Sequence, residues 1–364
     1  MAPFKFIRAL ALAGLARDQV DNTQASGTNP IGDLTVKFLG NQVADNSCSH
    51  RDLGFTGHLR GKWYAVYGDT LWCAAGVSDP TQDTDGFHGM VRDSVSALTD
   101  DALVVHDLHL NSDDPVAHQN QFVPFNETWG ETNLFGFGGT SIVETDYTSG
   151  TGAVYYLVND AENYKGAGVG KVELVDGVPT VTHRFGDSGW WWSGDSTPKY
   201  GDIAAYWDPK SKYIYILGNP PSSESGFPAS SYVYQARVPA ADAFDLSKYE
   251  YWWGRQQGWK SDVLSTFTSE TAIMWGVGQG QITYNKHFKK YIYVHLGGST
   301  VYLRSAPSPE GPWSADKEIY TATPIDNGLV YAGLAYPHLD TSGKTLTIGF
   351  TNNNRIQIIK VTFV

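Results

Sequence analysis

The sequence predicts an all-β fold, and specifically a five-bladed β-propeller. Along most of the 364 residues, runs of β-branched and aromatic residues alternate with polar turns, and helical periodicity is scarce. Glycine (39 residues), tyrosine (21) and tryptophan (12) are abundant. This composition is typical of many tight turns between short strands that carry flat apolar side chains. A hairpin of one design also recurs along the chain.

Five such hairpins are recognisable, each with an apolar run on either side of a polar turn. Their runs cover residues 52–55 with 62–67, 141–144 with 153–158, 202–206 with 213–217, 280–283 with 291–295, and 331–336 with 345–350. The spacing suits one four-stranded sheet per hairpin, and such sheets bury their faces by stacking on their neighbours, as in a propeller. A β-sandwich is the alternative, but it does not require a unit that recurs five times. We expect the polar segments 77–90, 111–136, 186–200 and 219–230 to form long loops over one face.

We expect residues 35–364 to form a single propeller domain, preceded by an N-terminal segment, residues 1–34. Within it, Lys5 and Arg8 precede an apolar run at 9–16, which fits either a secretory signal peptide or a first strand. No stretch approaches about 18 uncharged apolar residues, so no transmembrane helix is expected. The sequence favours an extracellular protein, with a cytoplasmic one as the alternative, and a monomer.

The charge balance and the absence of several motifs exclude many function classes. Thirty-eight acidic residues against 26 Lys and Arg give a net charge of −12. The general surface is therefore not expected to bind nucleic acid or anionic membranes. The two cysteines allow at most one bridge, between Cys48 and Cys73. No zinc-type histidine spacing, serine nucleophile elbow or P-loop is present. We expect no cofactor, although the Asp-rich loop 79–85 could hold a structural calcium ion.

Asp52 and Asp69 form the clearest candidate catalytic pair. Asp52 begins one strand of a hairpin and Asp69 ends the other, so antiparallel pairing brings them to one rim of the sheet. Two carboxylates at a channel mouth can act as a glycosidase pair, in which one protonates the departing oxygen and the other attacks or activates water. The alternative is structural, with Asp69 as a turn cap and Asp52 as a hydrogen-bond acceptor. Glu131, Glu144, Asp202 and Glu270 are reserve candidates for the acid.

Further candidates come from strand starts, which line a propeller channel, and from two motifs. Arg92 and Asp93 follow a loop, where they serve either as a carboxylate partner and a pKa-raising neighbour or as a surface ion pair. Side chains alternate along a strand, so the three indoles at 190–192 cannot all face one core, and at least one should be free to stack on a sugar. The residues expected to contact substrate are His50, Arg51, Arg92, Asp93, Trp191, Trp192, Asp202, Gln281 and His338.

Several runs resemble the domain-of-unknown-function family 4185, some of whose members are grouped as glycoside hydrolase family 183. They are residues 50–54 (HRDLG), 64–70 (YAVYGDT), 92–94 (RDS), 305–313 (SAPSPEGPW), 335–338 (AYPH) and 351–353 (TNN). The resemblance spans roughly residues 35–364. It implies a five-bladed propeller and endo-acting cleavage of D-arabinan by two aspartates, which match Asp52 and Asp69. The Trp-rich loop at 190–192 has no counterpart in that family that we can match.

The sequence therefore predicts a glycoside hydrolase that acts on an arabinan-type or other pentose-containing polysaccharide. Arg51, next to Asp52, is expected to depress the pKa of Asp52 and so favour a nucleophile or base role, leaving Asp69 as the general acid. Two alternatives remain. One is a glycan-binding propeller without catalysis, and the other is an arabinofuranosidase-like or levanase-like propeller whose acid comes from a middle blade.

Overall fold

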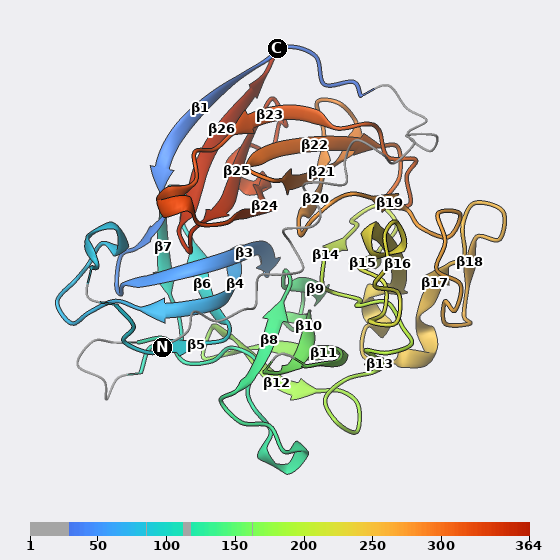
Figure 1. Ribbon diagram of the computed structural model, residues 1–364, viewed down its shortest axis with the longest axis horizontal. Coiled ribbons are helices and arrows are strands. Elements are labelled where there is room, and N and C mark those ends of the chain that lie inside the picture. The colour runs from blue at the N-terminus through green and yellow to red at the C-terminus, as the bar shows by residue number, and fades with distance from the viewer. Residues whose placement is uncertain (1–28, 85, 112–117, 162) are drawn as a thin grey trace.

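The chain folds into a five-bladed β-propeller, as the recurring hairpins predict (Figure 1). The structure is a computed structural model that describes residues 29–84, 86–111, 118–161 and 163–364. In it, five small sheets are arranged in a ring, and the inner strands of neighbouring sheets contact one another around the axis. No helix in the described ranges is long and apolar enough to cross a membrane.

Each blade begins at the axis and adds strands outward. The first blade comprises β3 (Ser49–Leu59), β4 (Lys62–Trp72), β5 (Met90–Val91), β6 (Ser94–Leu98), β7 (Val104–Asp107) and β2 (Val43–Ala44). The second comprises β8 (Phe135–Gly139), β9 (Val143–Asp146), β10 (Thr151–Asp160), β11 (Asn163–Val175), β12 (Val178–Arg184) and β13 (Trp192–Ser193). The third comprises β14 (Ala204–Trp207), β15 (Tyr213–Gly218), β16 (Tyr232–Pro239), β17 (Glu250–Trp252), β18 (Trp259–Lys260) and β19 (Met274–Trp275).

The last two blades have four strands each. The fourth comprises β20 (Gln281–Asn285), β21 (Lys290–Gly297), β22 (Thr300–Ala306) and β23 (Lys317–Thr321). The fifth comprises β24 (Val330–Tyr336), β25 (Thr345–Asn352), β26 (Ile356–Phe363) and, from the other end of the chain, β1 (Leu34–Asn41). Short 3-10 turns are found in the connections, at Pro80–Gln82, Glu127–Trp129, Ala229–Ser231, Ala240–Asp242, Leu246–Lys248, Ile325–Asn327 and Pro337–Leu339.

Strand β1 closes the ring by pairing antiparallel with β26, from Leu34 opposite Phe363 to Asn41 opposite Gln357 (Figure 1). Ahead of this strand, Ile31 already packs in the core between the fourth and fifth blades, and the expected boundary at residue 35 stays a prediction. Both readings of residues 1–16, signal peptide or first strand, concern residues outside the described part of the chain.

The core is divided among the interfaces between neighbouring blades. On β15, Ile214 and Ile216 pack in the cluster shared with the second blade, while Tyr215 and Leu217 pack in the cluster shared with the fourth. This alternation follows from the two-residue period of a strand. It explains why both faces of a blade strand are apolar, unlike a strand with one face in water. Full burial of each such side chain contributes roughly 1.5–3 kcal/mol.

The two faces of the ring differ. We call the face where the first strands of the blades begin, at Asp52 on β3 and Tyr331 on β24, the upper face. The second strands end there because each pairs antiparallel with its predecessor. Loops 77–90 and 219–230 follow β4 and β15, and loop 186–200 leads into β14, so all three open at the upper face. The opposite, lower face carries the tight turns of the hairpins.

Candidate functional site

Asp52 lies on a β-bulge at the upper end of β3. The pairing of β3 with β4 steps from Arg51 opposite Thr70 to Leu53 opposite Tyr67, so Asp52 faces the two residues between them, Gly68 and Asp69. Leu53 adopts a left-handed conformation with φ of 59°, which costs roughly 1–2 kcal/mol for a non-glycine residue. Bulges of this kind re-aim a side chain next to a functional site.

A second bulge, on the neighbouring inner strand β24, presents Tyr331 to Asp52. The register of β24 with β25 shifts between Tyr331 and Gly333, and the intervening Ala332 is left-handed with φ of 56°. The Tyr331 hydroxyl donates a hydrogen bond to Asp52 Oδ2. Tyr331 was not among the residues that the sequence predicted to contact substrate, where His338 stood for this part of the chain. The start of the 331–336 run itself carries the signal that could have identified it.

The surroundings of Asp52 favour its neutral, protonated form. Its Oδ1 is buried and has no hydrogen-bond partner among the described residues. It packs so closely against Gly68 that a Cβ at position 68 would overlap it. Burial, and then the charge of Asp69, raise the pKa of Asp52 to about 7, against the hydrogen bond from Tyr331, which lowers it. A carboxyl group that holds its proton near neutral pH can act as a general acid.

Asp69, at the upper end of β4, is the more accessible member of the pair. Its side chain is 41% exposed, and its Oδ1 lies 3.7 Å from Nη1 of Arg92. Burial raises the pKa of Asp69 above its usual value, and the charge and hydrogen bond of Arg92 offset this rise only in part. The structure thus brings together Asp52, Asp69, Arg92 and Tyr331. Because Asp69 combines solvent access with a cationic neighbour, it is the group better suited to ionise.

The expected influence of Arg51 on Asp52 is wrong. Successive side chains on a strand point to opposite faces, and the Arg51 guanidinium donates to both oxygens of Asp107, at 2.8 and 2.9 Å. It also lies over the ring of Tyr67, 4.7 Å from its centroid. Arg51 is only 5% exposed, so it fixes the interior of the first blade and does not contact a glycan. The prediction that Asp52 is the nucleophile or base and Asp69 the acid depended on this effect of Arg51, so it has no support from Arg51.

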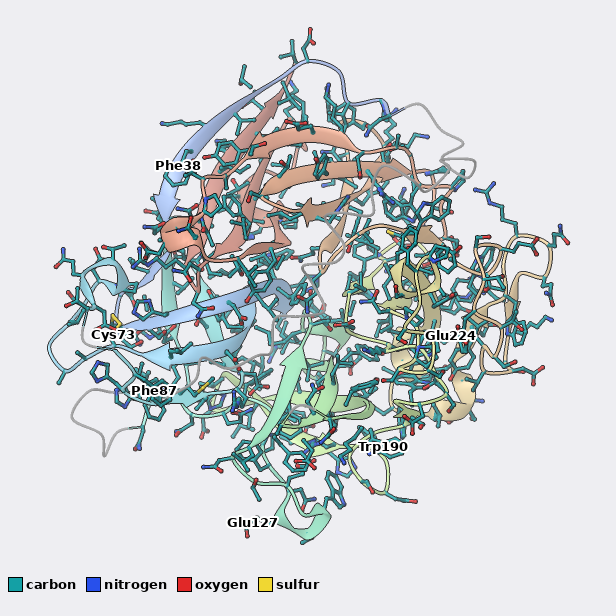
Figure 2. All side chains as sticks on the ribbon, viewed as in Figure 1. Phe38, Cys73, Phe87, Glu127, Trp190 and Glu224 are labelled. Carbon is teal, nitrogen blue, oxygen red and sulfur yellow. A yellow bond between two sulfur atoms is a disulfide. The ribbon has the colours of Figure 1, made fainter. Side chains whose placement is uncertain are left out.

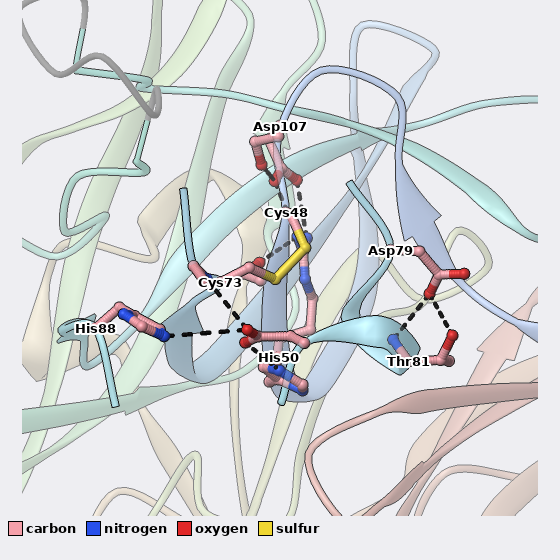
Figure 3. Close-up of a disulfide and its surroundings, with 12 residues drawn as sticks. Cys48, His50, Cys73, Asp79, Thr81, His88 and Asp107 are labelled. Atoms are coloured by element: carbon pink, nitrogen blue, oxygen red, sulfur yellow. Dashed lines mark hydrogen bonds and ion pairs between the residues drawn. A yellow bond between two sulfur atoms is a disulfide. The ribbon is translucent and has the colours of Figure 1, made fainter. Parts of the chain in front are cut away.

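A disulfide brackets the hairpin that carries both aspartates. Cys48, just before β3, is bonded to Cys73, just after β4, with their Cα atoms 5.5 Å apart (Figure 3). Next to it, Asp83 receives the Ala74 backbone amide at 3.2 Å and lies 2.9 Å from Nε2 of His50. His50 is therefore engaged with this loop and does not face Asp69.

The Asp-rich loop makes its own protein contacts. Asp79 caps a 3-10 turn by accepting the backbone amide and the hydroxyl of Thr81 (Figure 3). Within the described residues, the one cluster with the geometry to hold a metal is His50, Cys73 and Asp83. The sulfur of Cys73 is committed to the disulfide. Calcium binding by this loop stays a prediction.

Two further residues expected to contact substrate, Asp93 and Trp192, are buried in the interior. Asp93 is fully buried and accepts the backbone amides of Phe122 and Val123. Trp192 is 1% exposed, donates its indole N–H to the Tyr251 hydroxyl at 3.0 Å, and packs in the core between the second and third blades. Neither can contact a glycan, so these predictions are wrong. Trp191 is half-buried against Phe185 and the same core, which is a packing role and not an open platform.

Two other residues expected to contact substrate, Gln281 and His338, lie below the upper face of the propeller. Gln281 is buried, exchanges hydrogen bonds with the backbone of Thr56 and accepts one from the Ala335 amide, which joins three inner strands across the axis. His338 stacks on Trp63 at the lower end of the hairpins, with ring centroids 4.9 Å apart. Trp63 pairs with His58, six strand residues or about 20 Å from Asp52, so His338 is far from the aspartate pair. Gln281 bonds Thr56, which is four strand residues or about 13 Å from Asp52.

Most of the other carboxylates that the sequence offered as candidates for the general acid lie away from the aspartate pair. Glu131 forms a buried two-pronged pair with Arg184, at 2.5 and 2.8 Å. Glu144 accepts the Arg60 amide at the lower end of the second blade, and Glu270 is exposed in a loop. Only Asp202, directly before β14, lies at the upper face near the axis. Two surface hollows of about 150 and 510 Å³, lined in part by Asn285 and by Leu103, contain neither Asp52 nor Asp69.

The fold and site define a five-bladed propeller with two neighbouring, partly buried aspartates at its upper face. The family described as Domain of unknown function (DUF4185) matches residues 179–359, just under half of the chain, which together with the fold confirms the resemblance. This match covers the third and fourth blades and parts of the second and fifth, and it does not include Asp52 or Asp69. No curated protein matches the chain.

Solved structures share the fold at low sequence identity. A putative hydrolase from Bacteroides ovatus ATCC 8483 has a TM-score of 0.62 at 15% identity, covering 94% of this chain and 95% of that one. Exo-beta-1,3-galactanase from Phanerochaete chrysosporium, solved with beta-1,3-galactotriose, has a TM-score of 0.50 at 12% identity. The alignment covers 90% of this chain but only 64% of the galactanase. The propeller is thus one found in glycoside hydrolases, and at these identities the likeness concerns the fold alone.

Proposed function

We propose that this protein is a glycoside hydrolase in which Asp52 is the general acid and Asp69 is the base or nucleophile. The observation that carries the proposal is the asymmetry of the pair. Burial raises the pKa of Asp52 to about 7, and its carboxyl group accepts a hydrogen bond from Tyr331, whereas Asp69 is accessible and faces Arg92. Two carboxyl groups whose surroundings separate their protonation states are what acid-assisted glycosidic cleavage requires.

The proposed reaction divides the work between the two groups. Asp52 donates its proton to the glycosidic oxygen as the C–O bond breaks, so that the departing sugar leaves as an alcohol. Asp69 either attacks the anomeric carbon or removes a proton from a water that does so. Arg92 keeps Asp69 ionised for that step, and Tyr331 orients the carboxyl group of Asp52. The first substrate to test is arabinan, because the family resemblance implies D-arabinan cleavage.

The experiment compares wild type with Asp52→Asn and Asp69→Asn on polysaccharides that include D- and L-arabinan, with the anomeric product followed by NMR. Both variants should lose roughly 10³-fold or more in kcat. An activated aryl glycoside needs no protonation, so it should restore turnover to Asp52→Asn alone. Azide, which replaces a missing carboxylate nucleophile or base, should rescue Asp69→Asn and release a glycosyl azide of inverted configuration. If the enzyme retains configuration, azide also rescues Asp52→Asn on the activated substrate, but the glycosyl azide then has retained configuration.

Asp176→Asn, on an exposed turn, is the matched control and should retain full activity. Interchanged rescue patterns would overturn the assignment of roles while keeping the hydrolase. A wild-type protein that binds a glycan without releasing product, with both variants binding equally, would refute the enzyme and support a glycan-binding propeller.

A further inference from the structure

Outside the aspartate pair, the upper face carries a second polar group of residues between the second and third blades. On the second blade, Gly136 on β8, Asn159 on β10 and Tyr164 on β11 are cross-strand neighbours. Directly paired residues project to the same face of a sheet. Gly138 follows on that face and is paired with Leu157, which packs against the core shared with the third blade. This face therefore looks toward the third blade.

Gly136 and Gly138 leave the backbone of β8 uncovered by side chains on this face of the second blade. A Cβ at Gly136 or Gly138 would meet no atom within 4 Å, and neither residue has a positive φ that would itself demand glycine. The intervening Phe137 and the following Gly139 point the other way, into the interface with the first blade. Open backbone at the upper end of an inner strand lets a ligand approach closely.

The third blade presents a carboxylate on the other side of this open strip. Asp202 accepts a hydrogen bond from Asn219 Nδ2 at 2.7 Å. Burial raises the pKa of Asp202, and the positive charge of Lys199 is near enough to oppose this rise. Lys199 Nζ also lies 5.0 Å above the ring of Tyr164. The Tyr164 hydroxyl is buried and has no partner among the described residues. A buried hydroxyl without a partner costs about 1–3 kcal/mol unless a ligand satisfies it.

We propose that Tyr164, Lys199 and Asp202, over the bare strip of Gly136 and Gly138, form a sugar-binding subsite for the glycan chain that the aspartate pair cleaves. The inference rests on the proposed function, because the ligand is taken to be a glycan. The carboxylate accepts sugar hydroxyls, the ammonium donates to them, and the phenol gains its missing partner. Gly138 lies on the blade between Asp52 and Asp202, so the chain crosses the upper face from the first blade to the third. The subsite therefore favours oligosaccharides over single sugars.

The test measures oligosaccharide binding by calorimetry in an Asp69→Asn background, which removes turnover. The probes are arabino-, xylo- and beta-1,3-galacto-oligosaccharides of two to six sugars. Relative to this parent, Asp202→Asn should weaken binding of the longer probes about tenfold and Tyr164→Phe about fivefold. Gly138→Leu should abolish it by filling the strip. Gly32→Leu is the matched control, because a Cβ there also meets open space but near the start of β1.

The outcomes separate this inference from the proposed function. If wild type cleaves a glycan while Tyr164→Phe and Gly138→Leu leave affinity and KM unchanged, the subsite is refuted and the hydrolase stands. If oligosaccharides bind in a manner that depends on Tyr164 and Asp202 but wild type cleaves nothing, the subsite stands and the hydrolase is refuted. Absence of binding by every probe overturns the subsite. Should Asp202→Asn fail to fold, the Tyr164 and Gly138 variants still decide the question.

Discussion

Replacing Asp52 by asparagine should stabilise the folded protein above neutral pH. The pKa of Asp52 is raised from 3.8 to about 7, so the folded state binds this proton more tightly than the unfolded state does. The associated stability is fully present below pH 4 and is lost as the pH rises to about 7. A shift of about 3 pKa units corresponds to about 4 kcal/mol. Asparagine is neutral throughout and avoids this loss.

The assay is thermal and urea unfolding of wild type and Asp52→Asn at pH 4.5 and pH 8. The stability gained by the variant should grow between these two values by up to about 4 kcal/mol, or about 5 °C in Tm for a chain of this length. Asp176→Asn, on its exposed turn, should show no such growth. A stability difference that is constant with pH, or that shrinks as the pH rises, would refute the argument that burial and Asp69 keep Asp52 protonated.

Three more predictions follow from the site and its support. Tyr331→Phe removes the hydrogen bond that lowers the pKa of Asp52, so the alkaline limb of the pH–rate profile should move to higher pH; a limb that moves down would contradict this. Cys48→Ser should cost about 3 kcal/mol in urea unfolding, since the bridge closes a loop between residues 25 positions apart, and wild type in reductant should match it. Glu131→Gln leaves Arg184 buried without its carboxylate and should cost about 3–5 kcal/mol in the same assay.

The prediction for Glu131→Gln has an internal control in the same blade. Lys171 and Glu173 form a partly exposed ion pair at 2.7 Å in the same blade, and exposed pairs contribute about 0–1 kcal/mol. Glu173→Gln should therefore change the free energy of unfolding little. Equal losses in the free energy of unfolding for the two glutamate variants would show that burial does not set how much the Arg184–Glu131 pair contributes to stability.

Local patterns in the sequence were enough to predict the blades and the meeting of the two aspartates. Hairpin register alone brings Asp52 opposite Asp69, since one begins and the other ends paired strands. The sequence could not place Arg51, whose orientation depends on the interior carboxylate Asp107 in another strand of the blade. It also could not reveal the two bulges, because left-handed Leu53 and Ala332 carry no turn signature.

The tryptophan run shows a different limit. Alternation correctly separates the side chains of Trp190 and Trp191 from one another, but it does not say what lies beyond each face. In a propeller, both faces of a blade meet another blade, so a large aromatic residue that is turned away from one core enters the next one. Trp191 and Trp192 nevertheless both pack on the core between the second and third blades, Trp192 with Tyr251, and no loop composition could have indicated that.

The pairing of β1 with β26 sets the order in which this protein can be completed. Residues 34–41 are made before the other strands of the propeller, yet their partners at 356–363 are made after them, so during synthesis the first strand must wait unpaired until more than 300 further residues have been made. The relative contact order is raised by this single pairing, and the final closure is slow because distant segments must meet. Until then the waiting strand is an open edge, exposed to a second copy of the chain or to a chaperone.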